Sequence, residues 1–415
     1  MDKGRPWSSL GQINDDNILN TGMELLGLLA QRHASGEGVG LREEMLVLAE
    51  AGHLAIRGEG KGRPQSDLFV AGVMLTQRIF GHQMPHGIAP HRLIAYINAL
   101  VPPLPPCVPY LLEELATPDQ MLRPSDAMVA YRAWAAAAAH EDLRYHAPVR
   151  YSGAWTVTGD THVGRAKMAD NQTNQDAMFY ATNDRAALVA VADGISESDV
   201  GTGDMASRIF VETVRSWWKD GSFKIGTGGG QEFLVEMMRQ ANQAISERSA
   251  ALAGGSLIGR TPGGTTAVAA LCRGDQVELA CVGDSRAYLV TPCGTGLLTA
   301  DQNARLQSLL SGTVVDEKVA DALIGYLGHV DANGQPVLLP VWYRRLRVLP
   351  GEILVLCSDG LHDYAGLNHL KFLRKLGKYA ETMTLPDIAQ ALIADANAAG
   401  GGDNATVVLA QLQQL

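Results

Sequence analysis

The sequence has no apolar run long enough to cross a membrane. Its longest apolar stretches, such as residues 186–192, have the length of a single strand, whereas a membrane-spanning helix needs about 20 apolar residues. The N-terminus lacks the apolar core of a signal peptide. The cysteines form no C-x-x-C pair, and most lie in apolar segments, as buried free thiols do in a reducing compartment. These absences predict a cytoplasmic protein without a membrane partner. The cysteines are Cys107, Cys272, Cys281, Cys293 and Cys357.

The sequence also lacks an excess of basic residues and has no low-complexity block. Its 34 Lys and Arg stand against 44 Asp and Glu, which gives a formal net charge of −10. A nucleic-acid-binding surface needs concentrated Lys and Arg, so a nucleic-acid partner is not expected. With 46% hydrophobic and 19% charged residues, the composition is that of a soluble globular protein. At 415 residues the chain is too long for one ordinary core, which favours two domains.

The first part of the chain is predicted to be helical. Residues 67–80 place apolar side chains on one helical face before a glycine, and residues 126–143 are rich in strong helix formers. A proline-rich stretch at 101–109 interrupts the helices. We place the domain boundary near 145–152, which gives a mostly helical domain over 1–148 and a second domain over 149–415.

The second domain alternates short apolar runs with amphipathic segments. Helices are expected over about 204–218, 231–251 and 384–399. Strands are expected at 186–192, 266–272, 276–282, 286–290, 353–357 and 405–411. Near-continuous apolar strands imply sheets that helices cover, and the hairpin spacing over 276–290 suggests antiparallel pairing there. The pattern predicts an α+β fold: a sandwich of two antiparallel sheets flanked by helices.

Four aspartates fall at strand ends beside small residues, and three of the four follow or precede apolar strands: Asp176, Asp193, Asp359 and Asp403. A carboxylate at the rim of a buried strand costs several kcal/mol in desolvation unless it is paired or bound to a cation. The motifs themselves supply no matching Lys or Arg. Mg²⁺ and Mn²⁺ prefer oxygen ligands, so the four residues together indicate a divalent-metal site. Each one taken alone would more often be a turn or a helix cap.

These residues lie in motifs that resemble those of the PPM-class, or type 2C, metal-dependent protein phosphatases. The resemblance covers about 150–415 and follows the family's motif order. The motifs are NQDA (174–177), VADG (191–194), GGTTAVAAL (263–271), VGDSRAYLV (282–290), LPGEILVLCSDGL (349–361) and GGGDNATVVL (400–409). The resemblance implies hydrolysis of phosphoserine or phosphothreonine on proteins, by water that two Mn²⁺ or Mg²⁺ ions activate.

The resemblance also implies a role for each acidic residue. Asp193 would bridge the two ions, with the carbonyl of Gly194 as a further ligand. Asp359 and Asp403 would complete the shell of the first ion. Asp176 would orient a water, so the four aspartates are the expected catalytic residues. In a separate motif, Asp284 matches the family's position for a third, more weakly bound ion. The alternative is that Asp284 pairs with Arg286 or caps the hairpin turn.

The sequence departs from the family pattern near the expected substrate site. Gln175 stands where the family often has Glu, and Asn171 stands where many members have an Arg that binds the substrate phosphate. Arg165 or Lys167 could bind the phosphate instead, although both could equally be ordinary solvated charges. His162 is a weak candidate for a general acid. These departures bear on catalytic rate more than on metal binding.

A fainter resemblance, to the C-lobe of protein kinases, runs through residues 20–138. It rests on QSDLFVAGVMLTQRIFGHQMP (65–85) and ATPDQMLRPSDA (116–127), with weaker likeness at 28–36 and 41–56. A kinase needs an Asp beside its nucleophile and another on magnesium, and residues 34–66 contain no Asp or Asn. The resemblance therefore implies a degenerate lobe for docking or regulation, toward a partner kinase or a substrate; the alternative is an unrelated helical domain.

Three functions remain in view. The leading hypothesis is an active serine/threonine protein phosphatase with a phosphoprotein substrate. The second is a weakly active or inactive scaffold that binds a kinase or phosphoprotein, which Asn171 and Gln175 would favour. The third is a phosphatase of small phosphoesters. Retention of the strand-end carboxylates favours an enzyme, because a scaffold does not require unpaired buried charges.

Overall fold

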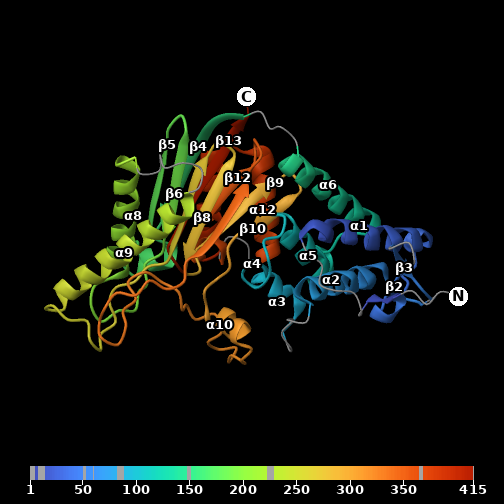
Figure 1. Cartoon of the computed structure of the whole chain (residues 1–415), viewed down its shortest axis with the longest axis horizontal. Helices are drawn as coiled ribbons and strands as arrows, with labels where there is room; N and C mark the ends of the chain where they lie inside the picture. The colour runs from blue at the N-terminus through green and yellow to red at the C-terminus, as the bar shows by residue number, and fades with distance from the viewer. Residues whose placement is uncertain are drawn as a thin grey trace. The chain divides into compact units, whose positions relative to one another are not determined.

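The computed structural model describes residues 5–7, 15–49, 53–58, 60–81, 88–146, 151–221, 229–363 and 368–414 (Figure 1). The chain forms two compact units: residues 1–147 with Cys293–Gly296, and residues 148–292 with 297–415. The predicted boundary between residues 148 and 149 lies outside the described residues.

The first unit is mostly helical, as its sequence predicts. Its helices are α1 (Asp15–Arg32), α2 (Pro64–Phe80), α3 (Pro90–Ile94), α4 (Ile97–Leu100), α5 (Val108–Ala116) and α6 (Ala127–His146). A small antiparallel sheet joins β1 (Arg5–Pro6), β2 (Leu46–Leu48) and β3 (Leu54–Ile56). Proline at the first position of α2 suits a helix start, because the missing N–H would have no partner there.

Two five-stranded antiparallel sheets contain the strands of the second unit, and the edge strand β10 includes residues that are grouped with the first unit. The first has the order β11-β8-β7-β6-β5 and the second β10-β9-β12-β13-β4. The first sheet comprises β5 (Ala177–Thr182), β6 (Ala186–Ala192), β7 (Ala267–Arg273), β8 (Gln276–Val282) and β11 (Trp342–Arg347). The second comprises β4 (Tyr151–His162), β9 (Arg286–Thr291), β10 (Gly294–Leu297), β12 (Ile353–Cys357) and β13 (Ala405–Gln414).

Helices cover the outer faces of both sheets. In Figure 1, α8 (Gly203–Lys219) and α9 (Gly230–Leu252) lie on one side, against β5–β8, and α12 (His369–Thr382) lies on the other side, against β9. Helix α13 (Leu385–Ala398) packs on β4 and β13. The short helices are α7 (Arg165–Ala169), α10 (Ala304–Ser311) and α11 (Asp359–His362). The expected sandwich of antiparallel sheets with flanking helices is therefore confirmed.

Strand β6 shows why its sequence is continuously apolar. Every residue of Ala186–Ala192 is buried. Leu188 and Ala190 face the core under α8 and α9, whereas Val189 and Val191 face the core between the two sheets. Because successive side chains point to opposite faces, a strand between two cores can have no polar position.

Side-chain caps fix two of the predicted helix starts. The Thr202 hydroxyl accepts a hydrogen bond from the backbone N–H of Met205 at the start of α8. The Thr384 hydroxyl accepts one from the N–H of Asp387 at the start of α13. Such caps satisfy N–H groups that have no partner inside the helix.

The expectation of antiparallel pairing across residues 276–290 is wrong for β8 and β9. The two strands belong to different sheets, and β8 pairs instead with β7 and β11. Residues 283–285 carry the chain from one sheet to the other, and Gly283 adopts φ 110°, which favours glycine. The short spacing is therefore a crossing between sheets.

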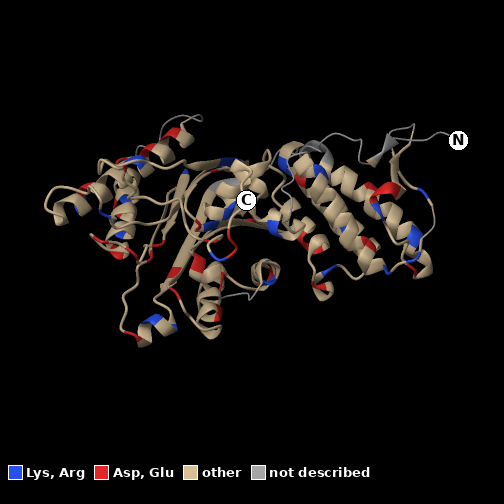
Figure 2. Cartoon of the chain, turned by 90° about the horizontal axis from the view of Figure 1, so that it is seen from below, with Lys and Arg blue, Asp and Glu red and all other residues tan. Residues whose placement is uncertain are grey.

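Charges are mixed over the described chain. In the view of Figure 2, Lys and Arg residues alternate with Asp and Glu residues along the helices of both units. Among the described residues, no helix combines the length and apolar character that a membrane span requires.

Candidate active site

The strand register brings the predicted acidic residues to one end of the sandwich. Ala177, at the start of β5, pairs with Ala192, at the end of β6. Asp176 directly precedes Ala177 and Asp193 directly follows Ala192, so the two aspartates lie at the same edge of the first sheet. In the second sheet Cys357 pairs with Val407. This pairing places Asp359 close to the segment that contains Asp403, just before β13.

The backbone around Asp193 is held by the start of the neighbouring strand. Its N–H donates to the Thr266 hydroxyl at 3.0 Å, and its carbonyl accepts from the Thr266 N–H at 2.8 Å. The Thr265 hydroxyl donates to the same carbonyl at 2.8 Å. A Cβ on Gly194 would lie 2.4 Å from the backbone of Gly203, so only glycine fits where α8 begins.

Asp176 is buried between the two sheets' ends, with 8% of its surface exposed. The Ser358 hydroxyl donates to its Oδ2 at 2.7 Å and accepts from the N–H of Thr406 at 3.0 Å. Oδ1 of Asp176 is buried without a hydrogen-bond partner. One side of the carboxylate is thus fixed by the second sheet, and the other oxygen is available to a ligand.

The aspartates strongly perturb one another. Burial, followed by the charges of Asp359 and Asp403, raises the pKa of Asp176 to about 7 despite the Ser358 hydrogen bond. Burial and the charge of Asp176 raise the pKa of Asp193 well above its usual range. Burial also raises the pKa of Asp359, whose side chain is hydrogen-bonded to Asp193. Asp176 and Asp193 therefore retain protons at higher pH than a solvated aspartate does, and the pKa of Asp359 shifts in the same direction.

Asp284 lies at the crossing between β8 and β9. Burial and the charges of Asp359 and Asp301 raise its pKa to about 8. Arg286 forms a two-pronged ion pair with Asp301, at 2.9 and 2.7 Å. The alternative in which Asp284 takes Arg286 as its partner is therefore not what the structure shows.

Lys167 contacts Asp403 directly. Its ammonium group touches Oδ1 of that carboxylate. The motifs themselves contain no Lys or Arg partner for these carboxylates, and the basic partner of Asp403 comes instead from α7. Arg165, on the same short helix, is exposed.

The other residues of the departing motifs lie around this loop. Asn171 is exposed and has φ 57°. His162 accepts the N–H of Gly164 at its Nδ1, at 2.9 Å. Gln175 accepts the Ser196 hydroxyl at 2.6 Å, so its side chain is paired with the segment that follows the DG motif.

The acidic residues fit divalent cations in chemistry. Oδ1 of Asp176 and Oδ1 of Asp359 are buried without hydrogen-bond partners, and carboxylate oxygens are the ligands that Mg²⁺ and Mn²⁺ prefer. Among the described residues, however, no three acidic, His or Cys side chains are arranged as a ready-made metal site. The carboxylates interact with other groups in this structure: Lys167 contacts Asp403, and Asp359 interacts with Asp193. A cation bound between the carboxylates would take the place of these interactions.

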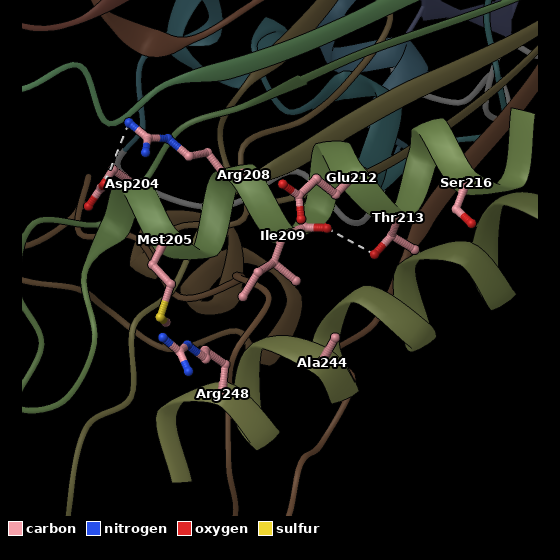
Figure 3. Close-up of a pocket in the computed structure, with 9 residues that line it drawn as sticks. All are labelled: Asp204, Met205, Arg208, Ile209, Glu212, Thr213, Ser216, Ala244 and Arg248. Atoms are coloured by element: carbon pink, nitrogen blue, oxygen red, sulfur yellow. Dashed lines mark hydrogen bonds and ion pairs between the residues drawn. The ribbon is translucent and has the colours of Figure 1, made fainter. Parts of the chain in front are cut away.

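A separate pocket is lined by residues of α8 and α9 (Figure 3). Met205, Ile209 and Ala244 form its apolar part, and Arg208 and Arg248 lie at its edge with Asp204. The closest atoms of Arg208 and Asp204 are 3.7 Å apart. The strand-end acidic residues do not line this pocket, so it is distinct from the candidate active site.

Comparison with known proteins decides the family. The model of the family described as protein phosphatase 2C matches residues 163–395. The chain belongs to the protein phosphatase 2C family. The matched residues run from just after β4 to within α13, and membership of this family confirms the expected class of enzyme, a protein phosphatase.

Curated relatives and solved structures agree with this assignment. The serine/threonine phosphatase stp of Listeria monocytogenes is 27% identical over 240 residues, covering 56% of this chain and 87% of that protein. The phosphatase PstP of Mycobacterium tuberculosis is 26% identical over 248 residues, covering 58% of this chain and 42% of that protein. The S. agalactiae serine/threonine phosphatase has a TM-score of 0.51 at 24% identity, covering 62% of this chain and all of that one, and this likeness shows the fold.

Sequence reasoning missed the polar residues that support the acidic ones. Ser358 precedes Asp359 and positions Asp176. Asn404 follows Asp403, and its Oδ1 accepts the N–H of Gln175 at 2.9 Å. Both are adjacent to predicted aspartates, so the motifs contained them, but their partners lie far away in the chain.

Proposed function

We propose that this phosphatase 2C domain hydrolyses phosphoserine and phosphothreonine in proteins, using Mn²⁺ or Mg²⁺. One observation carries the proposal: strand ends from both sheets bring the aspartates together, and Oδ1 of Asp176 and Oδ1 of Asp359 are buried without hydrogen-bond partners. Family membership supports the same reaction, and the curated relatives are named as serine/threonine phosphatases.

We assign Asp193, the Gly194 carbonyl, Asp359 and Asp403 to two ions, and Asp284 to a third. The ions would supply a nucleophile from water near neutral pH and would neutralise the phosphoryl oxygens. The Thr266 contacts hold the backbone of Asp193. These hydrogen bonds fix the backbone of one proposed ligand, Asp193, to the start of β7.

We assign to Asp176 the orientation of a water molecule through its unpaired oxygen, Oδ1. Its raised pKa suits a group that exchanges protons near pH 7. Ser358 fixes the opposite oxygen. The cysteines take no part, because burial raises the pKa of the Cys272, Cys281 and Cys357 thiols and keeps them protonated.

The phosphate of the substrate is assigned to Lys167 and Arg165. Both lie on α7, and Lys167 already lies at one of the proposed ligands. An ammonium or guanidinium group next to the ions would bind the phosphoryl oxygens by charge-assisted hydrogen bonds.

The test is hydrolysis of p-nitrophenyl phosphate and of a phosphothreonine peptide, with Mn²⁺, Mg²⁺ or EDTA. Turnover that needs metal and is lost in Asp193→Asn supports the proposal. The exposed Asp184→Asn is the matched control and retains activity. Preference for the peptide supports a protein substrate, and preference for the small ester favours the small-phosphoester alternative.

Metal binding without turnover would favour the scaffold alternative. In that case Asp193→Asn would weaken Mn²⁺ binding, measured by calorimetry, while a phosphopeptide would bind and persist unchanged. The absence of both metal binding and turnover would refute the assignment of the aspartates.

The helical unit is proposed to dock a kinase or a phosphoprotein. In support, Asp67 at the start of α2 is 1% exposed and organises the preceding loop. Its carboxylate accepts the N–H groups of Val39 and Leu41, at 2.7 and 2.6 Å, and contacts His33 at 2.9 Å. In Asp67→Asn, kcat/KM should fall for a phosphoprotein and stay constant for p-nitrophenyl phosphate. Equal kcat/KM for wild type and variant would contradict docking through this loop.

A cytoplasmic location is proposed as well. All five cysteines are free thiols, and four of them are buried. Free thiols without disulfides are usual in reducing compartments. Fractionation of cells that produce the chain would test this location.

A further inference from the structure

The loop that contains α7 is bound to the turn before β13. The N–H of Ala166 donates to the carbonyl of Gly401 at 3.0 Å. The side-chain amide of Asn404 donates to the carbonyl of Val163 at 2.8 Å. Two segments more than 230 positions apart in the chain are thus joined by two hydrogen bonds just before Lys167.

Two glycines let these backbones approach closely. A Cβ on Gly164 would lie 2.2 Å from the carbonyl oxygen of Asp403, and one on Gly401 would lie 2.5 Å from the backbone nitrogen of Arg165. Gly164 and Gly401 also adopt φ of 85° and 57°, where glycine is favoured. The close contact holds Lys167 beside Asp403.

The ion pair occupies an oxygen that a divalent cation would need. Oδ1 of Asp403 touches the Lys167 ammonium and accepts the N–H of Asn404 at 2.7 Å. The side chains of Lys167 and Asp403 are 17% and 36% exposed, so the pair is only partly screened by water. A cation that binds this oxygen must replace the ammonium, because the two would repel each other at that distance.

We propose that Lys167 is a built-in competitor of the divalent cation at Asp403, and that cation binding releases its ammonium group toward the substrate phosphate. The inference rests on the proposed metal-dependent function. In this arrangement one side chain weakens cation binding in the free enzyme and strengthens phosphate binding in the loaded enzyme. By linkage, phosphate and cation then favour each other's binding.

The test compares the wild-type chain with Lys167→Met and with Arg165→Met, an exposed cation on the same helix. Calorimetry gives the Kd of Mn²⁺ for the full-length chain. A second titration gives the Kd of inorganic phosphate for the Mg²⁺-saturated chain. In Lys167→Met, Mn²⁺ should bind about threefold to fivefold more tightly, as expected for loss of a partly exposed ion pair. Phosphate should bind about tenfold more weakly, because a charge-assisted contact is lost.

The two effects have opposite signs, which a general loss of structure does not produce. Arg165→Met should leave the Mn²⁺ affinity unchanged. Equal Mn²⁺ affinity in wild type and Lys167→Met overturns the inference and leaves the metal-dependent function intact. Tighter Mn²⁺ binding with unchanged phosphate affinity overturns the release of Lys167 to the phosphate. No Mn²⁺ binding in either chain overturns both this inference and the proposed metal site.

Discussion

The raised pKa of Asp176 makes the stability of the metal-free chain depend on pH. Burial and the neighbouring carboxylates raise this pKa from 3.8 to about 7, so the native state binds more protons than the unfolded chain between about pH 4 and 8. The free energy of unfolding therefore falls as the pH rises. From pH 6 to 8, native Asp176 retains about half a proton on average, and over these two pH units the loss is about 1.4 kcal/mol.

This loss should be visible as a change in melting temperature. For a domain of this size, 1 kcal/mol corresponds to about 2–4 °C, so Asp176 alone should lower Tm by about 3–6 °C between pH 6 and pH 8. The assay is calorimetry of the full chain in EDTA at both pH values. In Asp176→Asn this contribution should be absent, whereas the exposed Asp184→Asn should behave as the wild type does.

Saturating Mn²⁺ should remove most of the pH dependence in the wild type, because the ion stabilises the charged carboxylates. The reasoning would be refuted if wild type and Asp176→Asn lost the same Tm between pH 6 and pH 8 in EDTA. Such a result would mean that the Asp176 carboxyl does not change its charge between pH 6 and pH 8.

Three further substitutions test other parts of the site. Ser358→Ala removes the donor to the Asp176 carboxylate and a partner of a buried N–H, so urea denaturation should show a loss of about 1–3 kcal/mol. Asp301→Asn leaves the guanidinium of Arg286 without its charged partner, and the chain should lose about 3–5 kcal/mol by the same assay, since both side chains are largely buried; the double variant Arg286→Met/Asp301→Leu should recover part of it. Gly194→Ala places a Cβ against the start of α8, so we expect a loss of about 1–3 kcal/mol in thermal unfolding together with loss of phosphatase activity.

Much of the second unit could be predicted from its sequence because its signals are local. The apolar run of β6 matches the structure at both ends, and α9 and α13 begin and end within one residue of expectation. Strand β4 (Tyr151–His162) was not predicted, because it has no continuous apolar run of the kind that marked the predicted strands. Its pairing with β13 depends on contacts that are distant in the chain.

The candidate site was predictable as a set of residues and not as an arrangement. The aspartates could be identified because each follows or precedes an apolar strand beside small residues. Which strands pair, and therefore that β8 and β9 enter different sheets, depends on packing between distant segments. The contact between Lys167 and Asp403 depends on the close approach at Gly164 and Gly401. Neither feature has a signal within a short window of sequence.

The proposed ligands come from both sheets, and this has a consequence for folding. Asp176 and Asp193 adjoin β5 and β6, whereas Asp359 and Asp403 adjoin β12 and β13. Each sheet alone carries half of the acidic residues, so the site exists only after the two sheets have packed together. Recovery of activity during refolding should therefore follow the docking of the two sheets, later than the packing of Trp217 and Trp218 of α8 against the core of the first sheet. A divalent ion bound by carboxylates from both sheets would also link the two sheets and slow their separation during unfolding.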